Sequence, residues 1–364
     1  MGGVTLKVDD LEVSLVFGGM SPEHAASRAS FSFVYQELTA QNSGVALRNI
    51  YYVDLNNRIT CRPFKQNALA EDYMRPSEPV DYAAAADMMS RDTGYLFNLL
   101  HGNYGEDGHV QGLANLLKLR GSFGPVLPAS LAMSKVHMQR YVSGYQKIVK
   151  VPDTGVVTDS SKSPDTATLL GKFGGTKVVV KPNSLGASLF TECYTVTEAE
   201  VPRIIENLAL ISKYDERALV QAFVSGTEYS IGCVRLDNRV VALAAVRIDT
   251  ARGFFGHKEK HRQGNVEEIL VEEDRPVISQ LKAMSCELFD DLGFAHMCRF
   301  DYIVTGCDDI YFLEANPIPG LMRNSIFPKM LKKSGMSIAQ LIRHFSCQDA
   351  VKLHKRSVYD YSID

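Results

Sequence analysis

A chain of 364 residues is long enough for two or three compact units with clefts between them. Its hydrophobic content of 45%, its charged content of 22% and its net charge of -3 are typical of a soluble globular enzyme. This balance excludes bulk electrostatic attraction to nucleic acid or to a membrane surface, and we expect neither as a partner.

Seven cysteines are scattered along the chain without a CxxC spacing, which indicates free thiols in a reducing compartment. The first residues lack a basic region followed by an apolar stretch, and no apolar run approaches the roughly 18 residues of a membrane span. The sequence therefore predicts a cytoplasmic protein that acts on small molecules.

The first third of the chain predicts an α/β layer. Residues 11–17 alternate apolar and polar side chains as a strand does, and Gly18-Gly19 ends the run. Ser21-Pro22 predicts the N-cap and first turn of a helix that extends to about residue 40. Further strands are expected at 49–53 and 94–100, which favours a mostly parallel sheet.

Less regular segments follow. The polar stretch 56–79 is interpreted as an irregular excursion, and 152–176 as a variable connection. A helix is expected from 129 to 143. Predicted strands with short polar turns, typical of antiparallel sheets, then span 178–181, 218–224, 229–235, 240–248, 297–304 and 310–313.

The tail of the chain carries a helix start signal. Ser337 and Gln340 have the spacing of a capping box, which predicts a helix from there to about Phe345.

The segment from Cys298 to Asn316 predicts two strands joined by a polar turn. If Thr305 pairs with Ile310, counting outward places two carboxylates directly opposite each other. The two-residue period then puts four polar side chains on one face, namely Arg299, Asp301, Glu314 and Asn316.

Facing carboxylates repel each other unless a cation lies between them, and Mg²⁺ prefers carboxylate and amide oxygens. We therefore predict that Asp301, Glu314 and Asn316 bind magnesium while Arg299 holds a phosphate or carboxylate. The pattern alone leaves open an ordinary solvent-facing hairpin with hydrated carboxylates. The following loop favours the site, because the Gly320 amide and the Ser325 hydroxyl are suited to an anion beside the metal.

A loop of small residues from Lys181 to Ser188 follows a predicted strand and is of the kind that closes its N–H groups over phosphates. It lacks the GxxxxGK[ST] pattern, so a plain surface turn is the alternative. Lys135, Lys181 and Lys260 are candidates for phosphate contacts, although a single lysine is more often a solvated surface charge.

Eight segments resemble, in order, those of the D-alanine:D-alanine ligases of the ATP-grasp superfamily. They are FGGMSPEHAASRAS, LLHGNYGEDGHVQGLANLL, ASLAMSKVHMQRYV, VVVKPNSLGAS, LVQAFVSGTEYSI, FFGHKEKH, RFDYIV and FLEANPIPGLMRNSIFP. The resemblance implies an α/β (α+β) fold of three domains, with ATP held between the second and third. The implied domains are a Rossmann-like N-terminal domain at 1–134, a small central domain at 135–224 and a C-terminal domain at 225–364.

The resemblance also implies roles for individual residues. ATP would be bound through its phosphates by Lys135, Lys181, Ser188 and Lys260, at the adenine edge by Gln221, Phe223 and Val224, and at the ribose by Glu228. Two Mg²⁺ ions, with Mn²⁺ as an alternative, would bind at Asp301, Glu314 and Asn316. The family commonly has Glu where Gln221 stands, and the Gln221 carbonyl can still accept a hydrogen bond from the adenine amino group.

The implied reaction joins two amino acids through an acyl phosphate, releasing ADP and phosphate. Arg299 and the Gly320 amide would stabilise the oxyanion, with Lys260 and Ser188 also catalytic. The implied substrate-binding residues are Glu23, His101, Ala187, His261, Arg299, Gly320, Ser325 and Ile326. For His101 a buried structural role explains the sequence almost as well. The family also suggests a homodimer.

Two substrate-pocket positions depart from the family pattern. Ala187 and His261 stand where a serine and a tyrosine usually hydrogen bond with the residue matching Glu23. We therefore expect a ligase that joins two amino acids, or an amino acid and a hydroxy acid, with substrates other than two D-alanines. The alternatives are a D-alanine:D-alanine ligase proper and a non-catalytic ATP-binding regulatory protein.

Overall fold

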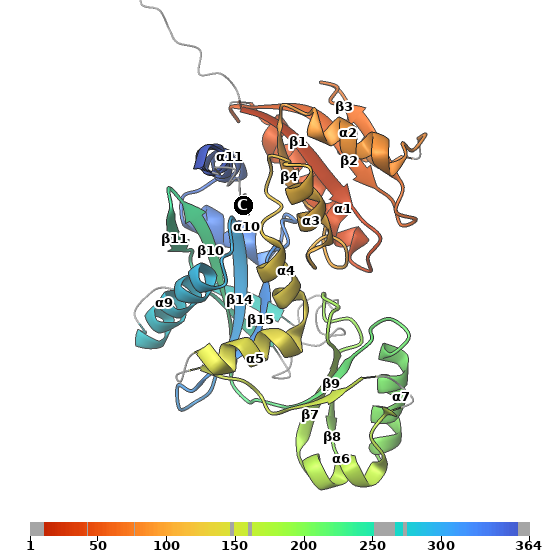
Figure 1. Cartoon of the computed structure of the whole chain (residues 1–364). Coiled ribbons are helices and arrows are strands. Elements are labelled where there is room, and N and C mark those ends of the chain that lie inside the picture. Colours follow the sequence, from red (N-terminus) through yellow and green to blue (C-terminus); the bar gives the residue numbers. More distant parts are fainter. Residues whose placement is uncertain are drawn as a thin grey trace, which may run out of the picture.

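The chain folds around three β-sheets in a computed structural model (Figure 1). The structure describes residues 11–41, 43–75, 77–145, 149–158, 162–250, 266–271 and 275–355. Within them, no helix combines the length and the apolar character that a membrane span needs.

The first sheet has the strand order β3-β2-β1-β4. Its strands are β1 (Leu11–Gly18), β2 (Val45–Val53), β3 (Ile59–Pro63) and β4 (Tyr95–Asn98). Strand β1 pairs in parallel with β2 and β4, which confirms the predicted mostly parallel sheet, while β3 pairs antiparallel with β2. Helices α1 (His24–Thr39), α2 (Tyr82–Ser90) and α3 (His109–Leu116) accompany this sheet.

Two local predictions in this region are wrong. Helix α1 begins at His24 rather than at Pro22, because Ser21-Pro22 lies in a turn where the Ser21 hydroxyl accepts a hydrogen bond from the Glu23 amide at 2.9 Å. The stretch 56–79 is also more regular than expected. It contains β3 and a 3₁₀ helix, η1 (Ala70–Met74), because pairing with β2 satisfies the β3 backbone.

The predicted helix at 129–143 is two helices, α4 (Val126–Met133) and α5 (Lys135–Tyr145). They meet at Ser134, whose extended backbone interrupts the helical path. This break places Lys135 at the first position of α5.

The second sheet is small and antiparallel, with the order β6-β9-β7-β8. Its strands are β6 (Thr154–Val157), β7 (Lys177–Pro182), β8 (Glu192–Thr195) and β9 (Ala218–Ala222), and its helices are α6 (Thr166–Phe173) and α7 (Val201–Ile211). The interpretation of 152–176 as a mere connection is wrong, since β6 and α6 lie there. Helix α6 has Asp165 as its N-cap and contributes Leu169 and Phe173 to the core of this sheet.

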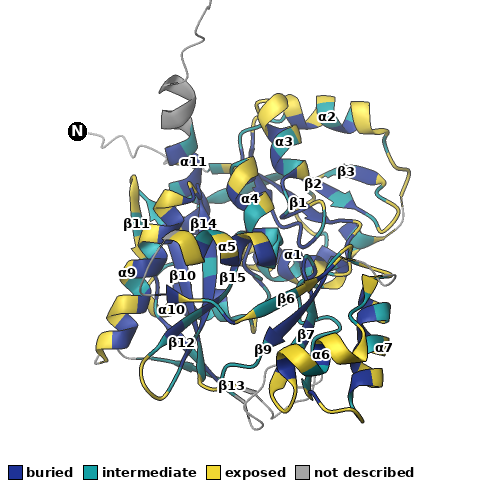
Figure 2. Cartoon of the chain, turned by 60° about the horizontal axis from the view of Figure 1, so that its bottom comes forward, coloured by how far each residue is buried: buried dark blue, intermediate teal, exposed yellow. Residues whose placement is uncertain are grey.

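The third sheet has the order β13-β12-β10-β14-β15-β5, and β11 pairs with β10. Its strands are β5 (Val149–Lys150), β10 (Thr227–Leu236), β11 (Arg239–Ala242), β12 (Val246–Thr250), β13 (Val266–Leu270), β14 (Met297–Val304) and β15 (Ile310–Asn316). Helix α9 (Pro276–Asp291) covers one face and presents its polar side to solvent (Figure 2).

Helices α10 (Ile326–Lys333) and α11 (Ile338–Lys355) follow the third sheet. The capping box of α11 is confirmed, because the Ser337 amide donates to Gln340 at 2.8 Å and the Gln340 amide donates to Ser337 at 3.2 Å.

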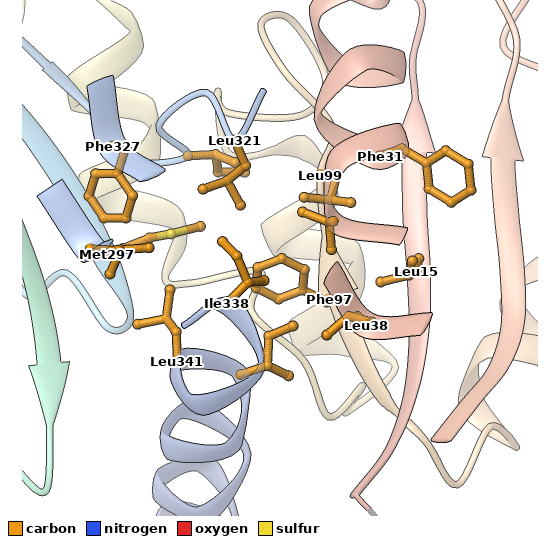
Figure 3. Close-up of a cluster of buried hydrophobic side chains, with 14 of the residues drawn as sticks. Leu15, Phe31, Leu38, Phe97, Leu99, Met297, Leu321, Phe327, Ile338 and Leu341 are labelled. Carbon is orange, nitrogen blue, oxygen red and sulfur yellow. The ribbon is translucent and has the colours of Figure 1, made fainter. Parts of the chain in front are cut away.

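One continuous apolar core joins the first sheet to the C-terminal helices. Figure 3 shows Leu15, Phe97 and Leu99 on the N-terminal side facing Leu321 and Ile338 on the other. The division at 134 and 224 remains a prediction. By strand pairing, β5 lies against β15 in the third sheet rather than with the small sheet.

Candidate active site

The predicted strand pair is present as β14 and β15, and Asp301 lies directly opposite Glu314. The assumed starting pair is wrong, because Val304 rather than Thr305 pairs with Ile310. A β-bulge next to Asp301 inserts Leu313 as an extra residue and restores the expected register beyond it. The bulge therefore brings Glu314 onto the face of Asp301.

The charged face consists of Arg299, Asp301, Glu314 and Asn316, and the side chains of Arg299 and Asn316 both bond to Asp301. Arg299 Nη2 lies 2.7 Å from Asp301 Oδ2, and Arg299 Nε donates to Asp301 Oδ1 at 2.9 Å. Asn316 Nδ2 donates to the same carboxylate at 3.1 Å, and Ser230 Oγ on β10 donates at 2.6 Å. A buried carboxylate held by this many donors is fixed in orientation.

The donors on this face fit a magnesium ion in chemical type. Asp301 and Glu314 offer carboxylate oxygens, and Asn316 uses its amino group toward Asp301, which leaves its carbonyl oxygen as a donor to a cation. In the described part of the chain, no three His, Cys, Asp or Glu side chains converge into a metal cage. A hard cation here would therefore complete its shell with ligand or water oxygens, as Mg²⁺ does beside phosphates.

Two lysines lie over the charged face. Lys135 Nζ is 3.4 Å from Glu314 Oε2 and donates to the Leu185 carbonyl at 2.9 Å. Loss of water contact, together with the charge of Lys135, lowers the pKa of Lys181 to about 8, although Glu314 and Glu228 oppose the shift. These positive charges close to the carboxylates favour an anionic ligand between them.

The small-residue loop after β7 lies beside Glu23 at the start of α1. A Cβ added at Gly186 would lie only 2.3 Å from Glu23 Oε1, so any other residue here would push the Glu23 carboxylate aside. The next two residues, Ala187 and Ser188, adopt left-handed backbone angles with φ of 52° and 55°. The structure thus brings the phosphate-loop candidates and the substrate candidate Glu23 together.

One cavity joins the three parts of the chain at this point. It is lined by Glu23, Lys135, Gly186, Glu314 and Asn316, among others. Because a cationic, an anionic and an amide side chain face the same space, the cavity suits a small zwitterion rather than an apolar ligand.

The adenine-edge candidates lie on β9 and just beyond it. Gln221 is buried, and its Nε2 donates to Gln139 Oε1 at 3.1 Å and to Thr154 Oγ1 at 2.9 Å. Phe223 and Val224 follow in the connection to β10, and Glu228 lies on β10 close enough to affect the pKa of Lys181.

His101 is enclosed by protein. Ser30 Oγ is 2.9 Å from His101 Nε2, and the ring also hydrogen bonds to the backbone of Ile318. Removal from water, with a smaller contribution from the charge of Arg299, lowers the pKa of His101 to about 4, although the Ile318 bond opposes the shift. The ring is therefore bonded within the protein, which favours a structural role for this histidine.

The loop between β15 and α10 carries the remaining candidates. Ser325 Oγ lies 3.3 Å from where a Cβ on Gly320 would stand, so the two groups predicted to hold an anion are neighbours. Ser325 is the N-cap residue of α10 and Ile326 is its first residue, a position where N–H groups are available to an anion. Lys260 and His261 lie outside the described residues.

Three residues that hydrogen bond to parts of the candidate site were not among the predicted site residues. Ser230 faces Asp301 across the β10–β14 pair, so strand alternation could have indicated it. Gln139 donates to the carbonyl of the bulged Leu313 at 3.3 Å. Glu106 lies in the HGxxGEDG motif, and its carboxylate accepts from the Gly102 and Ile318 amides at 2.7 and 3.2 Å. Burial, and then the charge of Glu23, raises the pKa of Glu106 to about 8.

Comparison with known proteins agrees with this arrangement. The family model for the D-ala D-ala ligase N-terminus matches residues 12–122, and the model for the D-ala D-ala ligase C-terminus matches residues 158–345. A D-alanine--D-alanine ligase of Azobacteroides pseudotrichonymphae is 26% identical over 91% of this chain and 97% of its own length. That of Geobacter sulfurreducens is 31% identical over 71% of this chain and 78% of its own.

Solved structures share the fold. The VanG D-Ala:D-Ser ligase from Enterococcus faecalis has a TM-score of 0.75 at 20% identity, covering 93% of this chain and 99% of that one. The D-alanine--D-alanine ligase from Bacillus anthracis complexed with ATP has a TM-score of 0.67 at 18% identity, covering 96% and 100%. By its matched family models and its fold, this chain belongs to the D-Ala-D-Ala ligase family and is an ATP-dependent ligase of the ATP-grasp type.

Proposed function

We propose that this enzyme activates the carboxylate of one amino acid as an acyl phosphate and joins it to a second amino acid or a hydroxy acid, with a substrate pair other than two D-alanines. The observation that carries the proposal is the charged face itself, where Asp301 and Glu314 lie opposite each other beneath Lys135 and Lys181. This is an arrangement for placing the γ-phosphate of ATP against a carboxylate.

The proposed reaction has two steps. A carboxylate oxygen of the first substrate attacks the γ-phosphorus, the bond from γ-phosphorus to the bridging oxygen breaks, and ADP leaves. The amine or hydroxyl of the second substrate then attacks the acyl carbon, and inorganic phosphate leaves from the tetrahedral intermediate. Arg299 and the Gly320 amide stabilise the negative oxygen of that intermediate.

Asp301, Glu314 and Asn316 would hold two Mg²⁺ ions, with Mn²⁺ as an alternative. Bound there, the metal neutralises phosphate charge during phosphoryl transfer. Lys135 and Lys181 position the phosphates, and Glu228 together with residues 221–224 positions the nucleoside. We propose that Lys260 and Ser188 add phosphate contacts.

The altered substrate pair rests on the pocket around Glu23. Glu23 would pair with the ammonium group of the first substrate, while Ser325 and the Ile326 amide would hold the carboxylate of the second. Ala187, directly after the Gly186 contact, offers no hydroxyl toward Glu23, so the pocket closes differently from the family pattern. We propose that His261 acts at the same pocket.

The second candidate is a D-alanine--D-alanine ligase proper, which the names of the curated relatives favour. The assembled charge network around Asp301 argues against the regulatory alternative, since a protein that only binds nucleotide has no need of this network. A homodimer remains a prediction from the family resemblance.

The test is phosphate release from ATP with D- and L-amino acids and with D-lactate, followed by mass spectrometry of the products. We expect release only with acceptable acids, and a main product other than D-alanyl-D-alanine. A main product of D-alanyl-D-alanine would support the second candidate. Tight ATP binding without turnover on any acid would support the regulatory one.

A further inference from the structure

Side chains from the first sheet and its helices hold the loop that carries Gly320 in place. This loop, residues 317–325, follows β15 of the third sheet, while three buried polar side chains that reach it belong to the first sheet and its helices. They are Ser30 on α1, and His101 and Glu106 in the segment between β4 and α3.

Each anchor reaches the loop backbone close to Gly320. The Leu321 amide donates to Ser30 Oγ at 3.2 Å, and the Ile318 amide donates to Glu106 Oε1 at 3.2 Å. His101 also hydrogen bonds to the backbone of Ile318. The anchored residues therefore stand on both sides of Gly320 in the chain.

The anchors are themselves held in place. Ser30 Oγ lies 2.9 Å from His101 Nε2, and because it accepts from Leu321 its own proton is free to point at the ring. Glu106 Oε2 accepts from the Gly102 amide at 2.7 Å, one residue after His101. Ser30, His101 and Glu106, which we call the loop clamp, thus form one connected set.

The surroundings of Ser30, His101 and the anchored backbone exclude water, whereas Glu106 also lines the cavity beside Glu23. Ser30 is fully buried and His101 is 3% exposed, while Ile318 and Leu321 are 3% and 0% exposed. Figure 3 shows the Leu321 side chain in the apolar core between the first sheet and the C-terminal helices. Buried hydrogen bonds that stay satisfied in this way hold a backbone rigidly, because breaking one leaves a polar group without a partner.

We infer that Ser30, His101 and Glu106 are positioning residues that set the direction of the Gly320 amide toward the reacting carbonyl. They act through Ile318 and Leu321 and need not touch substrate. This inference rests on the proposed role of Gly320 at the oxyanion. It means that the domain binding the first substrate also fixes the group that stabilises the transition state.

The experiment compares Ser30→Ala and Glu106→Gln with the control Ser285→Ala. Ser285 is also fully buried, and its hydroxyl bonds the Leu281 carbonyl and the Tyr302 hydroxyl away from this loop. Hydrogen exchange of peptides covering 317–325 is measured on each full-length protein without ligands. Turnover is measured with saturating ATP, Mg²⁺ and the amino acid of the panel above that gives the fastest phosphate release with the wild type.

We expect faster exchange in the loop for Ser30→Ala and Glu106→Gln and wild-type exchange for Ser285→Ala. In the same two variants kcat should fall by about 10- to 100-fold, as for a displaced catalytic group, while KM for ATP stays within about twofold. If one variant does not fold, the other still tests the loop clamp.

Loop exchange equal to that of Ser285→Ala would overturn the inference, as would a fall in kcat without a change in loop exchange. A wild-type protein that releases no phosphate with any amino acid would instead contradict the proposed function. The exchange comparison needs no turnover, so the two failures can be told apart.

Discussion

Glu314 differs from Asp301 in how much of it is available to a ligand. Asp301 is 3% exposed and already held by Arg299, Asn316 and Ser230, whereas the Glu314 side chain is 30% exposed and lines the cavity. Glu314 is therefore the carboxylate that an incoming cation would meet first.

Glu314→Gln should lower turnover by roughly 100-fold, because an amide keeps the shape but loses the charge that pairs with Lys135 and that would hold the proposed metal ion. The free energy of unfolding should change by less than about 0.5 kcal/mol, since the pair is partly exposed. Phosphate release and urea unfolding measure the two quantities. The matched control is Glu268→Gln, which removes a similar strand-borne pair with Lys329 at 2.7 Å and should keep full activity.

The buried His101 should make the free energy of unfolding depend on pH. Its pKa falls from 6.5 to about 4 on folding because the ring leaves water, with the Arg299 charge adding to the shift. Between those values the unfolded chain binds a proton that the folded chain does not, so this part of the stability is present above pH 6.5 and is lost as pH falls toward 4.

The check is urea unfolding of wild type and His101→Gln across that pH range. The variant should lose less stability on acidification than the wild type, while His137→Gln, at an exposed histidine, should behave as wild type. Equal pH slopes in all three proteins would contradict a neutral, buried His101.

At the scale of elements, the bulge in β15 decides which side chains reach the charged face. Without the extra Leu313, the register from Val304–Ile310 onward would place Glu314 opposite Phe300, on the core side. Helix α5 supports the bulge, because Gln139 Nε2 donates to the Leu313 carbonyl while its Oε1 accepts from Gln221. Gln139 therefore links Gln221, the proposed adenine contact, to the strand that carries Glu314.

Gln139→Leu should lower the free energy of unfolding by roughly 2–4 kcal/mol, because the Leu313 carbonyl and the Gln221 amide both lose a buried partner. ATP affinity, measured by calorimetry, should fall with it. Gln348→Leu is the control. Gln348 is also buried, but among the described residues it bonds only the Ala295 carbonyl, so its loss should cost less and leave ATP affinity unchanged.

The part of the charged face on β14 could be predicted because its cause is local: alternation along one strand places Arg299 and Asp301 on the same face. The pairing of Glu314 with Asp301 was predicted from a wrong starting pair, and in the structure it depends on the bulge. The bulge could not be predicted, because its carbonyl is satisfied by Gln139, which lies 174 residues away. Strand β3 was missed for a similar reason, since pairing with β2 rather than its own composition stabilises it.

For the whole molecule, the order of sheets follows from the motifs, but the contacts between them do not. Glu106 is an example of a residue whose contact with another sheet the sequence does not reveal. Its neighbour Asp107 bonds within its own loop, to Tyr104 and His109, and the sequence alone does not distinguish the two acids. Only the folded chain shows that Glu106 reaches Ile318, 212 residues later. The parts of the site that join the first and third sheets were therefore beyond sequence analysis.

We propose that these sheets together convert a carboxylate into an acyl phosphate. The decisive experiment uses an amino acid carrying ¹⁸O in its carboxylate, incubated with ATP, Mg²⁺ and the protein. An acyl phosphate passes one carboxylate oxygen to phosphorus, so the released phosphate should contain one ¹⁸O atom, as measured by mass spectrometry. Phosphate released without ¹⁸O, or at the same rate without amino acid, would contradict the account.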